Sequence, residues 1–180
     1  LLPSRLTRSS QAVSDLAGES LTRQVSLPVD RETAVPLAQV IFPEDMPDAA
    51  PVLESDLAAA VSGILREWSQ AEALKKYEIT PAMTCLLYGA PGTGKTRLAL
   101  WMAKQLGVPA VVGQLDGLIS SFLGTTARNI GALFAFAARY RCVLLLDEFD
   151  AIAKIRDDPQ EVGEIKRVVN ALLQNLDSRK

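Results

Sequence analysis

Apolar residues recur at helical spacing in four stretches of the chain, at residues 55–77, 97–104, 127–140 and 165–176. The last stretch is the most regular, because its apolar residues occupy positions i, i+3, i+4, i+7, i+8 and i+11. Each pattern predicts a helix with one face in a hydrophobic core, and Gly107 stands where a C-cap is expected. The predicted inward residues are Leu57, Val61, Ile64, Leu65, Trp68 and Leu74, then Ile130, Leu133, Phe134 and Ala137, then Ile165, Val168, Val169, Leu172, Leu173 and Leu176.

Three shorter runs, at residues 84–88, 108–113 and 141–146, are predominantly apolar. Strands without polar alternation are typical of a parallel sheet that is covered on both faces. Strands that alternate with helices imply a parallel sheet with right-handed crossover connections. We therefore predict an α/β fold with three layers, in which helices cover both faces of a parallel sheet.

The first 40 residues show no sustained period, and Pro3 and Pro28 interrupt them. We expect an N-terminal arm or linker over residues 1–40, partly flexible, and a folded region over residues 41–180. A short apolar stretch at residues 35–46 crosses this boundary. It could dock on the folded region as a strand or an extended segment.

The overall composition limits the function classes that fit the chain. Its 180 residues include 19 Lys and Arg against 21 Asp and Glu, a formal net charge of −2, so no basic excess predicts binding to nucleic acid. No apolar run approaches the roughly 20 residues that a membrane-spanning helix needs, and no secretory signal peptide is evident. Because the chain contains no histidine, His-based catalysis and His-ligated metals are excluded.

The chain has two cysteines, Cys85 and Cys142, each at the start of an apolar run. We expect both to be buried free thiols in a reducing compartment. Together with the lack of a membrane span, this predicts a cytoplasmic protein.

Residues 89–96 match G-x-x-x-x-G-K-[ST], the phosphate-binding P-loop, between an apolar run and a helical pattern. The glycines let successive backbone N–H groups point toward one phosphate, and the helix N-terminus adds its partial positive charge. Lys95 is expected to reach the β- and γ-phosphates of ATP, and the Thr96 hydroxyl to bind Mg²⁺. The expected residues for binding ATP or ADP are Gly89, Ala90, Pro91, Gly92, Thr93, Gly94, Lys95, Thr96, Arg97 and Asp147.

Two adjacent carboxylates, Asp147 and Glu148, follow the apolar run at residues 141–146. The C-terminal ends of parallel strands share one edge of the sheet with the P-loop, so these acids can approach the phosphates. Asp147 is expected to hold Mg²⁺ together with Thr96, and Glu148 to activate the water that attacks the γ-phosphate. Glu148 and Lys95 are thus the candidate catalytic residues. Alternatively, the two acids only begin a helix, where they favour its dipole.

These motifs resemble those of the AAA+ ATPases, in particular the classical AAA branch. The resemblance rests on four segments in the family's order, at residues 86–96, 116–128, 143–153 and 166–177. It implies a P-loop NTPase fold, of which residues 41–180 would form the N-terminal part of the large ATPase subdomain. It also implies a Mg²⁺-dependent ATPase that assembles into a hexameric ring and unfolds or remodels a protein substrate.

The resemblance also assigns Phe122, Leu123 and Gly124 to the family's pore loop, an aromatic–aliphatic–glycine element that grips a substrate polypeptide in the central channel. An aromatic ring offers a large contact area that tolerates any substrate sequence. The alternative is that Phe122 packs in the core below a turn.

The family's sensor 1 residue, arginine finger and helical lid would all follow Lys180. In the family's sheet the sensor 1 strand runs between the P-loop strand and the Asp147 strand. Without it those two strands would stand roughly 9.6 Å apart, twice the spacing of paired strands, with two unpaired edges. A disulfide between Cys85 and Cys142 would then be out of reach. We therefore expect an incomplete sheet, with further residues after Lys180.

Other function classes fit the sequence less well. A nucleotide-dependent switch of the GTPase type would need N-K-x-D after the P-loop, which the chain lacks. A small-molecule kinase would need an acceptor pocket and lid that nothing in the sequence marks. An AAA+ scaffold, or an ATPase associated with nucleic acid, is the alternative to the protein remodeller, although the near-neutral charge argues weakly against nucleic acid.

Overall fold

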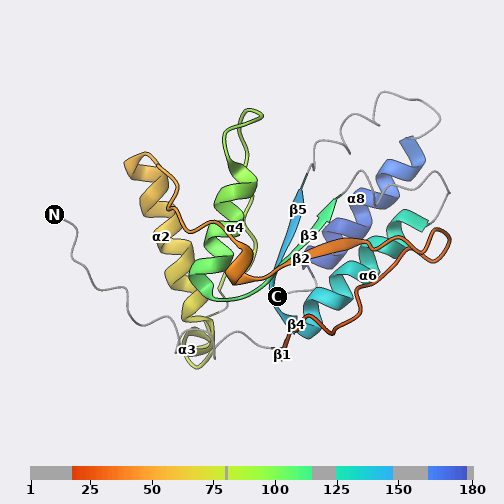
Figure 1. Cartoon of the computed structure of the whole chain (residues 1–180), viewed down its shortest axis with the longest axis horizontal. Helices are drawn as coiled ribbons and strands as arrows, with labels where there is room; N and C mark the ends of the chain where they lie inside the picture. Colours follow the sequence, from red (N-terminus) through yellow and green to blue (C-terminus); the bar gives the residue numbers. More distant parts are fainter. Residues whose placement is uncertain (1–17, 80, 115–124, 148–161, 178–180) are drawn as a thin grey trace. The chain divides into compact units, whose positions relative to one another are not determined.

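The computed structural model describes residues 18–79, 81–114, 125–147 and 162–177. These residues form two compact units, which Figure 1 labels by their helices and strands. Residues 42–109 form the first, here called the helical unit. Residues 18–41 combine with those from 110 onward to form the second, here called the sheet unit.

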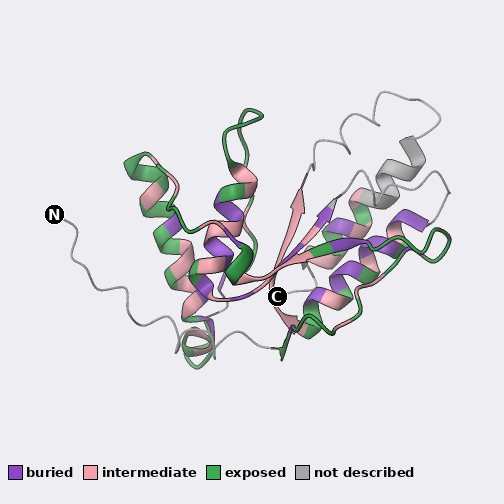
Figure 2. Cartoon of the chain, in the orientation of Figure 1, coloured by how far each residue is buried: buried purple, intermediate pink, exposed green. Residues whose placement is uncertain are grey.

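The helical unit contains η2 (Pro43–Asp45), α2 (Ser55–Ser69), α3 (Ala71–Lys75) and α4 (Lys95–Leu106). Helices α2 and α4 pack side by side (Figure 1). Figure 2 shows buried residues along α4 with exposed residues elsewhere on the same helix, as expected of an amphipathic helix. The buried side chains of the helices are Val61, Trp68, Ala71, Leu98, Ala99, Met102, Ala103 and Leu106, so Trp68 lies in the core as predicted.

The predicted helix at residues 55–77 is two helices in the structure. The backbone departs from helical geometry at Gln70 (φ −110°, ψ 13°), which ends α2 and precedes α3. Leu57, which we predicted to face the core, is 46 % exposed. The inward face of α2 therefore begins one turn later, at Val61.

Helix α4 ends at a left-handed glycine, as the sequence predicted. Gly107 has φ 68° and ψ 28°, and its N–H donates to the carbonyl groups of Ala103 and Lys104. In the same turn, the Lys104 ammonium donates to the Met46 carbonyl at 2.9 Å and to the Asp48 carboxylate at 2.6 Å. These bonds tie the segment after η2 to the end of α4.

The sheet unit contains a three-stranded sheet in the order β2–β3–β5. Strands β3 (Ala110–Gln114) and β5 (Val143–Asp147) run parallel, which confirms the parallel pairing predicted for the second and third apolar runs. Strand β2 (Ala38–Ile41) pairs with β3 in the antiparallel direction. The sequence had indicated only that this stretch could dock as a strand or extended segment.

A second, two-stranded sheet pairs β1 (Glu19–Ser20) with β4 (Tyr140–Arg141) in parallel. Gly18 stands at the start of this contact with φ 125°. A Cβ atom there would lie 3.0 Å from the carbonyl oxygen of Arg139. Only glycine therefore allows the segment before β1 to approach the start of β4 this closely.

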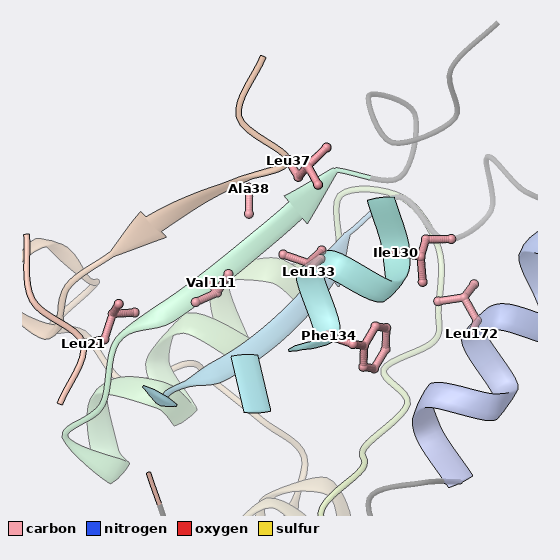
Figure 3. Close-up of a cluster of buried hydrophobic side chains, with 8 residues drawn as sticks. All are labelled: Leu21, Leu37, Ala38, Val111, Ile130, Leu133, Phe134 and Leu172. Atoms are coloured by element: carbon pink, nitrogen blue, oxygen red, sulfur yellow. The ribbon is translucent and has the colours of Figure 1, made fainter. Parts of the chain in front are cut away.

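The core of the sheet unit joins the sheet to helices α6 (Thr125–Arg139) and α8 (Val162–Asp177), which pack against each other. Figure 3 shows its buried side chains, with those of α6 and Leu172 of α8 close together and with Val111 on β3, which belongs to the same cluster. All four predicted inward residues of α6 are buried, namely Ile130, Leu133, Phe134 and Ala137. In α8, Leu172 is 2 % exposed, but Leu173 is 54 % exposed, so the apolar stripe is narrower than predicted.

The boundary that we expected at residue 40 falls inside the sheet unit. Leu21, Leu37 and Ala38 are buried in its core, and β2 forms one edge of its sheet. The described part of this stretch, from residue 18 to residue 41, lacks a periodic pattern because it contributes isolated apolar residues and two short strands, β1 and β2.

The strand predicted at residues 84–88 is not formed. Residues 81–89 belong to no helix or strand, and among the described strands none pairs with them. Leu86 is 77 % exposed and Tyr88 is 89 % exposed. A strand needs a neighbour for its N–H and C=O groups, and none of the described strands supplies one to this segment.

Both cysteines are free thiols, as expected. Each is half-buried rather than fully buried. Burial raises the pKa of the Cys85 thiol above its ordinary value, which lowers its reactivity at neutral pH.

Candidate nucleotide-binding site

The P-loop owes its shape to three glycines with positive φ. Gly89 has φ 148°, Gly92 has φ 78° and Gly94 has φ 85°. A Cβ atom at Gly92 or Gly94 would meet nothing within 4 Å. The requirement for glycine at these two positions therefore comes from the left-handed backbone and not from crowding.

The loop leads directly into the N-terminus of α4. Gly94 is the N-cap residue, and its carbonyl accepts the N–H of Leu98 at 2.8 Å. Glycine offers no side chain to cap the first turn, and that turn contains no acidic residue. The partial positive charge of the helix N-terminus is thus left to attract an anion.

Lys95 is the first residue of α4, and its side chain folds back over the loop. Its ammonium group donates to the carbonyl oxygens of Gly89 at 3.0 Å and Ala90 at 2.9 Å. The hydroxyl of Thr93 donates to the same Ala90 carbonyl at 2.9 Å. The Lys95 ammonium is therefore held within the loop by backbone carbonyls. Phosphate oxygens would compete with these carbonyls as partners of the ammonium.

The groups present fit a nucleotide with its Mg²⁺ ion. The helix N-terminus and Lys95 supply positive charge for phosphates. Thr96, half-buried in the first turn of α4, supplies a hydroxyl oxygen, the type of ligand that Mg²⁺ prefers. Arg97 follows on an exposed position of the same turn.

The segment that leads into the loop is held by two side chains that the sequence analysis did not assign to the site. The N–H of Ala82 donates to the Glu67 carboxylate at 2.8 Å, and its carbonyl accepts the Trp68 indole N–H at 2.7 Å. Nothing in the sequence pattern marks this contact, because it joins side chains of α2 to the backbone of a segment 14 and 15 positions away.

Asp147 is the last residue of β5 and lies opposite Gln114, the last residue of the parallel strand β3. It thus stands at the carboxyl edge of the parallel strands, where α/β folds bind their ligands. The P-loop belongs to the helical unit and Asp147 to the sheet unit. Their approach to a common nucleotide therefore stays a prediction.

Four predicted site residues lie outside the described residues, namely Glu148, Phe122, Leu123 and Gly124. Their roles in water activation and in a pore loop remain predictions. In the described part of the chain, no helix has the length and apolar character needed to cross a membrane.

Comparison with known proteins gives a family match. The sequence model of the family described as "ATPase family associated with various cellular activities (AAA)" matches residues 85–180. This range contains most of the apolar run at residues 84–88, the P-loop itself and the Asp147–Glu148 pair.

Several characterised and uncharacterised ATPases are similar to the chain. An uncharacterised AAA family ATPase of Sinorhizobium fredii is 42 % identical over 71 % of this chain and 38 % of its own length. A probable 26S proteasome regulatory subunit 10B of Caenorhabditis elegans is 36 % identical over 59 % of this chain and 27 % of its own length. The peroxisomal ATPase PEX1 of Saccharomyces cerevisiae is 41 % identical over 51 % of this chain and 9 % of its own length. The chain thus spans well under half the length of these relatives.

Proposed function

Because this chain belongs to the AAA family of ATPases, we propose that it binds ATP with Mg²⁺ and hydrolyses the γ-phosphate bond. The family has the P-loop NTPase fold, an α/β architecture, and the parallel β3–β5 pair is consistent with it. The observation that carries the proposal is the P-loop itself, where Gly94 leaves the N-terminus of α4 uncapped beside the Lys95 ammonium.

The loop residues bind and orient the nucleotide. Backbone N–H groups at the start of α4 surround the phosphates, and Lys95 exchanges its carbonyl partners for β- and γ-phosphate oxygens. Thr96 and Asp147 would hold the Mg²⁺ ion, which would neutralise charge on the phosphates. Glu148 accepts a proton from the water that attacks the γ-phosphorus, while the bond to ADP breaks.

We further propose that the longer protein uses this reaction to unfold or remodel a protein substrate in a ring, as a hexamer. Similar proteins carry the names of proteasome regulatory subunits and a peroxisomal ATPase, which supports a remodelling role. Phe122, Leu123 and Gly124 would contact the substrate from the pore loop. We expect no nucleic-acid partner, and the cytoplasmic location stays a prediction.

The decisive experiment measures the binding of MgATP to the chain by isothermal titration calorimetry. Lys95→Ala should abolish binding, whereas Lys76→Ala, a lysine in the exposed turn after α3, should bind like the unmodified chain. Retained ATP affinity in Lys95→Ala would refute the assignment of the P-loop.

A second experiment separates hydrolysis from binding. In the longer protein, Glu148→Gln should bind ATP with unchanged affinity but lose steady-state hydrolysis, because a glutamine cannot accept the proton of the attacking water. An unchanged ATPase rate would show that Glu148 is not the general base.

A further inference from the structure

Both backbone polar groups of Ala82 are bound by side chains of adjacent residues at the end of α2. Glu67 accepts the N–H at 2.8 Å, and the indole N–H of Trp68 donates to the carbonyl at 2.7 Å. In an extended segment, these two groups are ordinarily satisfied by a neighbouring strand. We call this pair of contacts the Ala82 clamp.

The two side chains of the clamp differ in burial. Trp68 is 9 % exposed in the core of the helical unit, and its indole has a single donor that needs a partner when buried. Glu67 is half-buried, and a carboxylate accepts an N–H more strongly than a neutral oxygen does. Pro81, just before Ala82, is buried as well and has no N–H of its own.

The clamp lies on the segment that delivers the P-loop. Residues 81–89 pair with none of the described strands, and Leu86 and Tyr88 extend into solvent. The clamp therefore holds the start of this segment, while Lys95 of α4 holds its end through contacts to Gly89 and Ala90, the first two residues of the loop. The segment between these two anchors leads directly into the loop, whose backbone must keep the directions that bind phosphate.

We propose that Glu67 and Trp68 are positioning residues for the P-loop, which they hold through Ala82 in a conformation ready to bind nucleotide. The proposal rests on the proposed nucleotide binding. Neither side chain touches the nucleotide. Removal of either bond lets residues 81–89 sample more conformations, and ATP must then select the competent one, which weakens its apparent affinity.

The test compares variants that break single bonds of the clamp, with MgATP as the ligand in calorimetry. Trp68→Phe keeps an apolar ring and removes the donor, and Glu67→Ala removes the acceptor. Each should weaken ATP binding by about 2- to 12-fold, the range that one hydrogen bond supplies. Glu67→Gln keeps an acceptor oxygen and should restore affinity to within about twofold of the unmodified chain.

Two further measurements distinguish positioning from general damage. Arg66→Ala, an exposed neighbour on α2, should bind ATP with unchanged affinity. In a Trp101→Phe background, Trp68 is the only tryptophan, and its emission should change when ATP binds and the P-loop is ordered.

The outcomes separate this inference from the proposed function. If the unmodified chain binds no MgATP, nucleotide binding itself fails. If the unmodified chain binds MgATP and Lys95→Ala does not, but Glu67→Ala and Trp68→Phe bind as tightly as the unmodified chain, the positioning role is overturned. A loss in Glu67→Ala that Glu67→Gln repairs, with a Trp68 signal that follows ATP saturation, supports it.

Discussion

The side-chain amide of Asn129 donates a 2.6 Å hydrogen bond to the carboxylate of Asp30, a residue 99 positions earlier in the chain. The other carboxylate oxygen accepts the N–H groups of Glu32 at 2.9 Å and Thr33 at 2.8 Å. Asp30 is 5 % exposed. This bond links the N-terminal stretch to α6 inside the sheet unit.

The Asp30 carboxylate should make the sheet unit acid-sensitive. The Asn129 amide, followed by the N–H groups of Thr33 and Glu32, lowers the pKa of Asp30 from 3.8 to about 2. A carboxylate whose pKa is lowered on folding contributes stability that is fully present above its unfolded pKa and lost as the pH falls through its folded pKa. This contribution should therefore disappear between about pH 4 and pH 2.

The test follows urea unfolding of Asp30→Asn by circular dichroism across this range. At pH 7 the variant should unfold at a lower urea concentration than the unmodified chain. The difference between the two urea midpoints should become smaller as the pH falls from 5 to 2. Glu32→Gln, in the same turn but exposed, is the matched control and should show no such trend. A difference that stays constant with pH would contradict the role of Asp30.

Leu133 should be among the most costly core positions to truncate. It is fully buried in the cluster of the sheet unit. Leu133→Ala should destabilise that unit by about 2 to 5 kcal/mol, because truncation removes apolar contacts and leaves a cavity. Ala135→Ser, at an exposed position of the same helix, should change stability by less than about 0.5 kcal/mol. Equal effects of the two changes on urea unfolding would mean that α6 does not bury Leu133 as described.

Two glycines of the helical unit should respond to alanine in opposite directions. Gly107 caps α4 with φ 68°, so Gly107→Ala should cost about 1 to 2 kcal/mol. Gly63 lies inside α2 without a positive φ, and a Cβ atom there meets nothing within 4 Å. Gly63→Ala should therefore stabilise the unit by about 0.5 to 1 kcal/mol. Urea unfolding followed by tryptophan fluorescence reports the stability of both variants, since Trp68 and Trp101 lie in this unit. A change in the urea midpoint of the same sign for both variants would refute the distinction.

Much of this architecture could be predicted from the sequence, because it rests on local patterns. The inward residues of α6, the C-cap at Gly107 and the P-loop motif each depend on residues a few positions apart. The antiparallel direction of β2 and the Asp30–Asn129 bond could not be predicted, since their partners are distant in the chain. The Ala82 clamp escaped prediction for a related reason, namely that one of its partners is backbone and carries no sequence signal.

The predicted pore residue Phe122 should separate substrate contact from hydrolysis. In the longer protein, Phe122→Ala should keep its ATPase activity but lose binding of fluorescein-labelled, carboxymethylated α-lactalbumin, a permanently unfolded probe, measured by anisotropy. Phe122→Tyr should retain binding, because its ring keeps the contact area. Binding that survives Phe122→Ala would favour the alternative that this ring packs in the core.

The sheet unit is made of two separate stretches of sequence, with the helical unit between them. This order has a consequence for how the protein folds during synthesis. Strand β2 leaves the ribosome before the entire helical unit, and its partner β3 follows only afterwards. At about 5 to 20 residues per second, the roughly 70 residues between them take on the order of 4 to 14 s to synthesise. During that interval the apolar side chains of β2 have no sheet to join, so the N-terminal stretch cannot complete its core until β3 has been made.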